Sequence, residues 1–479
     1  MTRLSLAAAR DPGPPSPPSP HRGGPRQVLI IVCAGVVLAS LDLFIVNVAL
    51  PQIARDLHSP NLGDLTWVLN GYAIVYASLL VFFGRLADRY RRDRAFLVGV
   101  AVFTAASAAC AASTSVAMLV AFRLVQAAGA ALLTPTSLGL VMAAYPAERR
   151  SGAVRAWTAT GGLAAALGPV VGGLLVASNW RLVFLVNVPV GLVALLVGYR
   201  RLPRVPGHPV TRPNPVGAVL ATAGIAVLTL ALVQAGSWGW GSAQTIAALA
   251  GAAALVGMFV AHCATSPVPL IRPSLFRSHQ FSGASLLAVT FSAAFGAMLL
   301  SIVLWEQGAW GWSALRCGLA IAPGPLMVPL ISFGVAGPLI GRYGSGYVIA
   351  LGSTTFAAGL AWWALAVTAR PDYLTGMLGG MLLTGIGVGF TLPTMMSSAS
   401  ASLPPEEFAT GSGVINMLRQ TGIALGVAIL VPVLGTGAEH HPSLTGFRHA
   451  WWMTAGIALL GLVPALGLLP RRTAKPATA

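Results

Sequence analysis

Long apolar runs separated by short polar joints constrain this chain more than any other feature of its sequence. A helix needs about 20 apolar residues to cross the roughly 30 Å hydrocarbon layer of a bilayer. From Val28 onward the chain offers runs of that length one after another. We therefore expect an all-α integral membrane protein with fourteen transmembrane helices, at residues 28–50, 66–84, 95–114, 116–142, 153–177, 182–199, 216–235, 244–263, 281–304, 319–336, 347–368, 373–396, 410–433 and 449–468.

Charged residues are too scarce for a large soluble protein. They make up 9% of the 479 residues, whereas 56% are hydrophobic and a further 55 positions are glycine. An ordinary soluble domain carries about 25% charged residues, so we expect most of this surface to face lipid. The four cysteines have neither a CxxC nor a metal-binding spacing. This predicts no disulfide framework and no metal site at Cys33, Cys110, Cys263 and Cys317.

Basic residues are distributed unevenly between the two faces of the predicted bundle. With the N-terminus inside, twenty-two Lys and Arg fall on inner segments and five on outer joints. Cytoplasmic segments of membrane proteins carry such an excess. The bias predicts that both termini are cytoplasmic, and it accounts for the formal net charge of +17 without a nucleic-acid partner. Because only one of the 29 basic residues is lysine, the composition favours a GC-rich bacterial genome, and hence the plasma membrane.

Two short strings indicate that the chain consists of two related halves. GRLADRYRR at 84–92 follows the second predicted helix, and GPLIGRYG at 337–344 follows the tenth. Repeated halves are a signature of secondary transporters. We expect a six-helix bundle at 27–200, an inserted two-helix segment with its linkers at 201–280, and a second six-helix bundle at 281–470.

Both ends of the chain are predicted to be tails outside the membrane. Residues 1–26 are rich in Pro, Ser and Gly and have almost nothing apolar to bury, so we expect a disordered cytoplasmic tail. A proline-rich ligand for a partner domain is the alternative. Residues 471–479 are expected to form a second cytoplasmic tail.

Two opposite charges fall inside predicted spans, where charges are costly and rare. Asp42 lies eight residues before Leu50, the outer end of the first helix, and Arg123 lies seven residues after Val116, the outer end of the fourth. At a rise of ~1.5 Å per residue, both sit about 10–12 Å below the outer boundary and can pair. Either the pair pins two helices together, or the aspartate exchanges a proton when the arginine moves away.

Two further charged residues lie in the second predicted bundle. Arg419, with Gln420 beside it, lies in the inner half of the thirteenth predicted helix, where it either lines a cavity or bonds helix carbonyls. Glu306 lies 25 residues beyond Phe281. That separation is about 37 Å of helix, so we expect Glu306 at the outer mouth and not at the midplane. A role for Glu306 in proton coupling is the alternative.

The fifth predicted helix contains a cluster of glycines around one proline. Small residues let helices approach closely, and proline frees a carbonyl and permits a bend. The cluster predicts a pliable hinge, with ordinary close packing as the simpler alternative. Its members are Gly161, Gly168, Pro169, Gly172 and Gly173.

Several of these strings occur in the order known from one family. LDLFIVNVALP at 41–51 is similar to a first-helix motif, the string at 84–92 to a loop motif, and the glycine cluster to a fifth-helix antiporter motif. Further matching positions in the fourth, sixth and thirteenth helices are Arg123, Gln126, Asn187, Asn416, Arg419 and Gln420. Together they make the chain resemble the major facilitator superfamily, and specifically its fourteen-span drug–proton antiporters.

The resemblance implies two bundles that rock about a substrate cavity near the midplane. Asp42 would take up and release the proton, with Arg123 as its partner, and the fifth-helix glycines would form the flexing interface. An inner-loop latch would consist of Gly84, Asp88, Arg89 and Arg92. The candidate cavity residues are Asn47, Gln126, Asn187, Asn416, Arg419 and Gln420.

The implied substrates are drugs, dyes or lipophilic cations, exported by a monomer in exchange for protons and without a cofactor. The residues themselves indicate only amphipathic organic compounds, because a cavity with few charges is suited to them. They do not distinguish cations from neutral antibiotics. A metabolite exporter or a proton symporter on the same fold is the alternative. A membrane-embedded enzyme is disfavoured because none of the eight histidines forms a catalytic or metal-binding motif.

Overall fold

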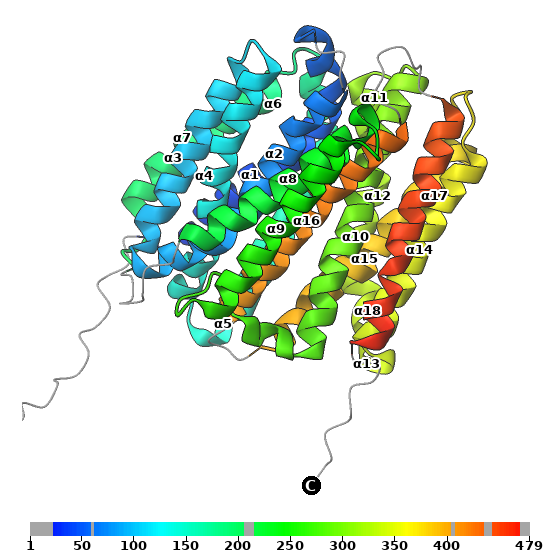
Figure 1. Ribbon diagram of the computed structural model, residues 1–479. Coiled ribbons are helices and arrows are strands. Elements are labelled where there is room, and N and C mark those ends of the chain that lie inside the picture. Colours follow the sequence, from blue (N-terminus) through cyan, green and yellow to red (C-terminus); the bar gives the residue numbers. More distant parts are fainter. Residues whose placement is uncertain (1–22, 59–61, 206–214, 404–407, 435–442, 470–479) are drawn as a thin grey trace, which may run out of the picture.

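Long helices run side by side through the structure, a computed structural model (Figure 1). It describes residues 23–58, 62–205, 215–403, 408–434 and 443–469, and these contain helices and no strand. In Figure 1 the helices before residue 205 lie on one side, and most of those after residue 310 lie on the other.

The first half of the chain contains α1 (Pro25–Asp56), α2 (Leu62–Arg89), α3 (Arg92–Ala111), α4 (Val116–Ala144), α5 (Ala147–Val176), α6 (Leu182–Leu185) and α7 (Asn187–Arg201). The middle contains α8 (Pro215–Trp238), α9 (Ala243–Thr265) and the short helix η1 (Pro273–Arg277). The second half contains α10 (His279–Leu304), η2 (Trp305–Ala309), α11 (Ala314–Ile321), α12 (Pro323–Ile331), η3 (Ser332–Ala336), α13 (Gly337–Tyr343), α14 (Ser345–Ala366), η4 (Tyr373–Met377), α15 (Leu378–Ala401), α16 (Phe408–Leu434), α17 (Leu444–Leu460) and α18 (Leu462–Gly467).

The structure confirms the predicted transmembrane helices. Among the described residues, thirteen helical segments have the length and hydropathy needed to cross a bilayer. The remaining predicted span, 153–177, corresponds to α5, whose 30 residues include the apolar stretch Leu167–Val176.

Two predicted spans are interrupted by breaks in the helix. The span at 182–199 is split at Val186 into α6 and α7. The span at 319–336 reaches from Ala314 to Tyr343 and is divided into α11, α12, η3 and α13. Proline lacks the N–H that a continuous helix requires, and this stretch contains four such residues, Pro323, Pro325, Pro329 and Pro338.

The ends of the chain require one correction. Helix α1 begins at Pro25, inside the tail that we predicted at 1–26, because proline is well suited to the first turn of a helix. Residues 1–22 and the predicted tail at 471–479 lie outside the described residues, so the disorder of both tails stays a prediction.

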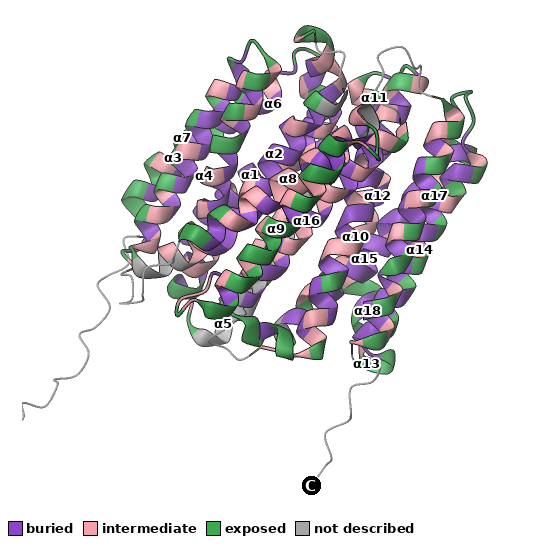
Figure 2. Ribbon diagram, viewed as in Figure 1, coloured by how far each residue is buried: buried purple, intermediate pink, exposed green. Residues whose placement is uncertain are grey.

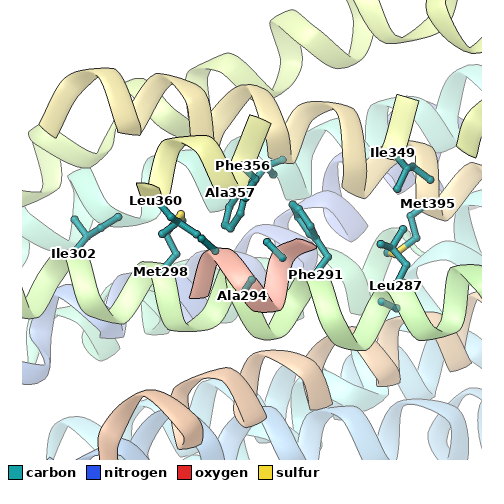
Figure 3. Packing of buried hydrophobic residues seen from close by; sticks show 14 of the residues in the cluster. Leu287, Phe291, Ala294, Met298, Ile302, Ile349, Phe356, Ala357, Leu360 and Met395 are labelled. Carbon is teal, nitrogen blue, oxygen red and sulfur yellow. The ribbon is translucent and has the colours of Figure 1, made fainter. Parts of the chain in front are cut away.

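Buried side chains form several apolar clusters, and two of these clusters contain residues of both halves. One cluster joins α1, α3 and α4 through residues such as Phe96, Phe103 and Leu133. In the second half, Phe291 and Met298 of α10 face Phe356 and Leu360 of α14 (Figure 3). The outward faces stay apolar but exposed, as Figure 2 shows most clearly for α9, so the exposed apolar surface is suited to contact lipid.

Glycines allow neighbouring helices to pack without intervening side chains. A Cβ added to Gly129 of α4 would lie 2.6 Å from the Phe103 nitrogen of α3. One added to Gly359 of α14 would lie 2.8 Å from the Gly380 oxygen of α15. Helix association in lipid relies on such van der Waals contact, because lipid tails are as apolar as the side chains.

The inserted helices α8 and α9 contribute unequally to the bundle. Ile225 and Ala226 of α8 pack against Ala73 of α2 and Ala424 of α16, which belong to different halves. Helix α9 packs on α8 and leaves most of its surface exposed (Figure 2). Helix α8 therefore bridges the halves, whereas α9 faces the surroundings of the bundle.

The two halves meet closely where α5 approaches α11. A Cβ on Gly173 would lie 2.5 Å from the Ala314 oxygen, and one on Gly318 would overlap the Pro169 carbonyl group. Nearby, the Gln307 side chain donates to the Val48 oxygen of α1 at 3.1 Å. The contact closes the predicted outer end of the bundle and leaves no room for a methyl group at either glycine.

This contact predicts the effect of adding single methyl groups. Gly318→Ala should lower the free energy of unfolding by about 1–3 kcal/mol, because a close-packed backbone contact must open. Gly257→Ala in α9 is the matched control, because nothing lies within 4 Å of its added Cβ. Thermal unfolding of the purified protein in detergent measures both. Equal stability of the two variants would contradict the close contact.

Candidate functional site

A buried ion pair joins two helices of the first half. Asp42 of α1 and Arg123 of α4 are both fully buried, and the arginine Nη1 donates directly to the aspartate Oδ2. The structure therefore places the two charges at one depth, as their spacing from the helix ends predicted.

Uncharged side chains complete the hydrogen bonding of Asp42. Gln126 Nε2 donates to Asp42 Oδ1 at 2.8 Å, and Asn187 Nδ2 donates to the same oxygen at 3.2 Å. Ser107 of α3 accepts from both amides, at 2.7 Å from Gln126 and 3.4 Å from Asn187. Sequence reasoning missed Ser107, whose one signal is a hydroxyl in the apolar part of α3, a signal that Thr104 shares. The carboxylate is thus surrounded by donors.

Arg123 is held on its other sides as well. Its Nε donates to the Val68 oxygen of α2 at 3.1 Å, and its guanidinium lies over the Tyr72 ring at 4.1 Å. The Phe184 ring of α6 lies 5.8 Å away. Such cation–π contacts stabilise a desolvated guanidinium. The remaining nitrogen, Nη2, has no hydrogen-bond partner among the described residues, so Arg123 retains unused donor capacity.

A cavity lies between the halves, beside this ion pair. Its lining comes from α1, α2 and α4 on one side and from α10 and α16 on the other: Leu43, Phe44, Asn47, Leu69, Asn70, Ala73, Arg123, Gly296, Leu299, Ile423 and Val427. The Phe44 and Phe295 rings meet edge to face across the two halves, with centroids 6.3 Å apart. Asn47 lines the cavity, but its Nδ2 donates to the Leu43 oxygen of its own helix at 3.2 Å.

The candidates in α16 lie one turn from this cavity. Arg419 Nη1 donates to Asn416 Oδ1 at 3.0 Å, so Arg419 bonds a side chain instead of the helix carbonyls. Gln420 is buried, and its Oε1 has no partner among the described residues. The structure therefore brings Asn416, Arg419 and Gln420 near the cavity without making them part of its lining.

Glu306 lies at the end of α10, within the π-helical turn η2. This is the end of the helix where we expected it, but the side chain is fully buried and not open to an aqueous mouth. Trp305 and Trp312 pack in the surrounding core, and Cys317 of α11 is its polar neighbour. The folding of α11 back over η2 causes this burial, which sequence spacing alone did not reveal. Glu306 does not contact the Asp42–Arg123 pair.

The inner loop is only partly described. The side chains of Asp88 and Arg89 lie outside the described residues, so their role as a latch stays a prediction. Gly84 faces Pro135 of α4, and Arg92 packs against Gly139. Sequence reasoning missed Asp93, which accepts from Arg91 at 2.5 Å and from the Val205 backbone at 3.3 Å. The sequence signal for Asp93 was its position among several arginines.

The fifth-helix cluster lies between two helices. A Cβ on Gly168 would lie 2.7 Å from the Phe44 Cβ, and one on Gly172 would lie 3.0 Å from the Ile45 oxygen. Gly161 is less tightly packed, with Val36 at 3.3 Å. On its other side α5 contacts α11 through Pro169 and Gly173, as described above. The cluster therefore packs α5 directly on the helix that carries Asp42.

Known proteins resemble this chain over most of its length. The family model described as the Major Facilitator Superfamily matches residues 32–427 and, in an overlapping match, 286–479. The tetracenomycin C resistance and export protein of Streptomyces glaucescens is 32% identical over 471 residues, covering 96% of this chain and 86% of that protein. The methylenomycin A resistance protein of Bacillus subtilis (strain 168) is 34% identical over 449 residues, covering 92% of each.

Among solved structures, the POT family transporter PepTSo has a TM-score of 0.65 to this chain. The match covers 92% of this chain and 97% of that one, at 17% sequence identity. At this identity the likeness shows a shared fold alone.

The buried ion pair predicts that removing one charge lowers the free energy of unfolding more than removing both. Arg123→Leu should lower the free energy of unfolding by about 3–5 kcal/mol, because it leaves a buried carboxylate without its cation. The double variant Asp42→Asn/Arg123→Leu should be more stable than that single variant, since no unpaired charge remains. Arg342→Leu, at an exposed arginine of α13, is the control. Thermal unfolding in detergent compares them, and a double variant less stable than the single would contradict the pairing.

Proposed function

The chain belongs to the major facilitator superfamily, and we propose that it exports drug- or antibiotic-like amphipathic compounds across the bacterial plasma membrane in exchange for protons. It is a multi-pass membrane transporter and not an enzyme. The names of the two relatives, a resistance and export protein and a resistance protein, support export of such compounds.

The observation that carries the proposal is the position of Arg123. One side of its guanidinium holds Asp42, and the same residue lines the cavity between the halves. A buried carboxylate favours the charged form beside a cation and the protonated form without one. A motion that separates the pair therefore loads Asp42 with a proton, and a motion that restores it releases the proton.

The cavity supplies the link between substrate and proton. Val68, Tyr72 and Phe184 surround Arg123 on its protein-facing sides, so its way out of the ion pair leads into the cavity that it lines. A substrate that binds between the halves, against this lining, keeps Arg123 on Asp42. Proton and substrate thus exclude one another, which is the condition for exchange.

The proposal also includes the orientation of the chain in the membrane and the motion of its halves. Both termini lie in the cytoplasm, as the arginine bias favours. The halves rock about the α5–α11 contact, and Asp88 and Arg89 latch the inner side. One chain forms the whole cavity, so a monomer suffices, surrounded by lipid on its apolar faces. The proton gradient is the energy source, with no cofactor.

The coupling is tested by proton flux in proteoliposomes against an imposed pH gradient. Asp42→Asn should reduce gradient-driven efflux and substrate-evoked proton release to background, whereas Asp42→Glu should keep part of both. Arg123→Lys should be impaired, because a buried lysine can lose its charge. Glu306→Gln is the matched control, since it removes a buried acid distant from the pair.

Two results would contradict the proposal. Exchange at the normal rate in Asp42→Asn, with loss in Glu306→Gln, would move the coupling to Glu306. Movement of substrate and proton in the same direction would make the protein a symporter.

A further inference from the structure

No carboxylate is available to a substrate in the cavity. Asp42 does not line it, and Arg123, Gln126 and Asn187 already donate to the oxygens of Asp42. No acid belongs to the described lining, whereas the guanidinium of Arg123 does. A cation that enters this space therefore meets a positive charge first, which favours substrates of another charge.

Arg419 adds a second positive charge on the opposite half. It lies four residues before Ile423 of the cavity lining, so it occupies the same face of α16, one turn away. Its Nε has no hydrogen-bond partner, and no described acid forms an ion pair with it. Its Nη1 donates to the neutral amide of Asn416. The residue as a whole is partly exposed, whereas its Nε is buried and therefore desolvated.

Two buried amides beside these arginines are also incompletely bonded. Asn70 lines the cavity with 1% of its surface exposed, and neither its Nδ2 nor its Oδ1 has a partner among the described residues. Gln420, next to Arg419, is 6% exposed with a free Oε1. A buried polar atom without a partner is costly and rare in folded proteins. Asn70 at the cavity and Gln420 one turn of α16 away from it indicate a ligand that binds between the halves and supplies the missing bonds.

We propose that the substrate is an amphipathic organic acid, whose carboxylate or phenolate group binds Arg419 while its apolar body lies between the halves, against the residues that line the cavity. The proposal rests on the transport function above and adds the substrate class. Arginine binds carboxylates through two parallel hydrogen bonds. Leu43, Phe44, Leu299 and Val427 offer the apolar surface that a ring system requires.

This placement agrees with exchange for protons. The acidic group lies on the C-terminal half, so it does not compete with Asp42 for Arg123. The apolar body occupies the space that Arg123 needs in order to leave Asp42. A bound acid therefore keeps Asp42 ionised while Arg419 neutralises the charge of the substrate.

Binding to purified wild-type protein in detergent tests the substrate class without requiring transport. Three probes share one ring and chain length and differ in the head group: pyrenebutyrate, pyrenebutanol and pyrenylbutyl-trimethylammonium. Energy transfer from tryptophan to pyrene reports binding. We expect pyrenebutyrate to bind about tenfold more tightly than the alcohol, the difference that one charge-assisted hydrogen bond contributes, and the cation to bind most weakly.

Variants at Arg419 test whether this residue binds the charged head group of the probe. Arg419→Gln should weaken pyrenebutyrate binding about tenfold and leave pyrenebutanol binding unchanged. Arg419→Lys, which keeps the charge, should retain most of the affinity. Arg342→Gln is the matched control, because Arg342 is an exposed arginine at the end of α13. Retained pyrenebutanol binding shows that each variant is folded.

The outcomes separate this inference from the transport function. Equal or tighter binding of the cation, or equal loss of all three probes in Arg419→Gln, would overturn the inference. Asp42-dependent proton exchange would stand in that case, since its flux assay depends on neither result. Selective loss of the acid in Arg419→Gln, with rescue in Arg419→Lys, supports it.

Discussion

The direct bond between Arg123 and Asp42 is the interaction on which the rest of this structure depends. Two charges buried in a low-dielectric interior persist only if they are paired and their remaining hydrogen bonds are satisfied. Gln126, Asn187 and Ser107 meet that condition for the carboxylate, and Val68 and Tyr72 meet it in part for the guanidinium. Five segments of the first half, α1, α2, α3, α4 and α7, are thereby positioned around one charged centre. The cavity lies where this centre meets the other half.

Close glycine contacts place α5 between a helix of its own half and a helix of the other half. Helix α5 lies on α1 through Gly168 and Gly172 and on α11 through Gly173. Around these contacts, Ile45 and Val176 belong to a buried cluster that also contains residues of the second half, whereas Phe291 and Phe356 pack within the second half (Figure 3). The structure thus joins its halves through both glycine contacts and side-chain packing. Because α5 touches the helix of Asp42, movement at that contact reaches the ion pair.

Sequence reasoning predicted the features that depend on residues close together in the chain. Apolar length predicted the spans, and counting residues from two helix ends placed Asp42 and Arg123 at one depth. It did not predict Ser107 or Asp93, because a single hydroxyl or carboxylate carries no pattern until the fold gives it a partner. It also placed Glu306 at an outer mouth exposed to water, whereas the side chain is buried. This burial depends on how α11 packs over η2, which is a tertiary contact. Sequence reasoning also did not predict that the Nε of Arg419 lacks a hydrogen-bond partner, because spacing shows where a charged residue lies and not what it bonds.

The central claim is that substrate and proton exclude one another through Arg123, and the protonation of Asp42 tests it most directly. Infrared difference spectra, recorded on adding substrate to the protonated protein, follow the carbonyl stretch of a protonated carboxyl group. The account predicts that substrate removes one such band in the wild type, and that the band is absent from Asp42→Asn. A band that substrate leaves unchanged, or that persists in Asp42→Asn, would contradict it.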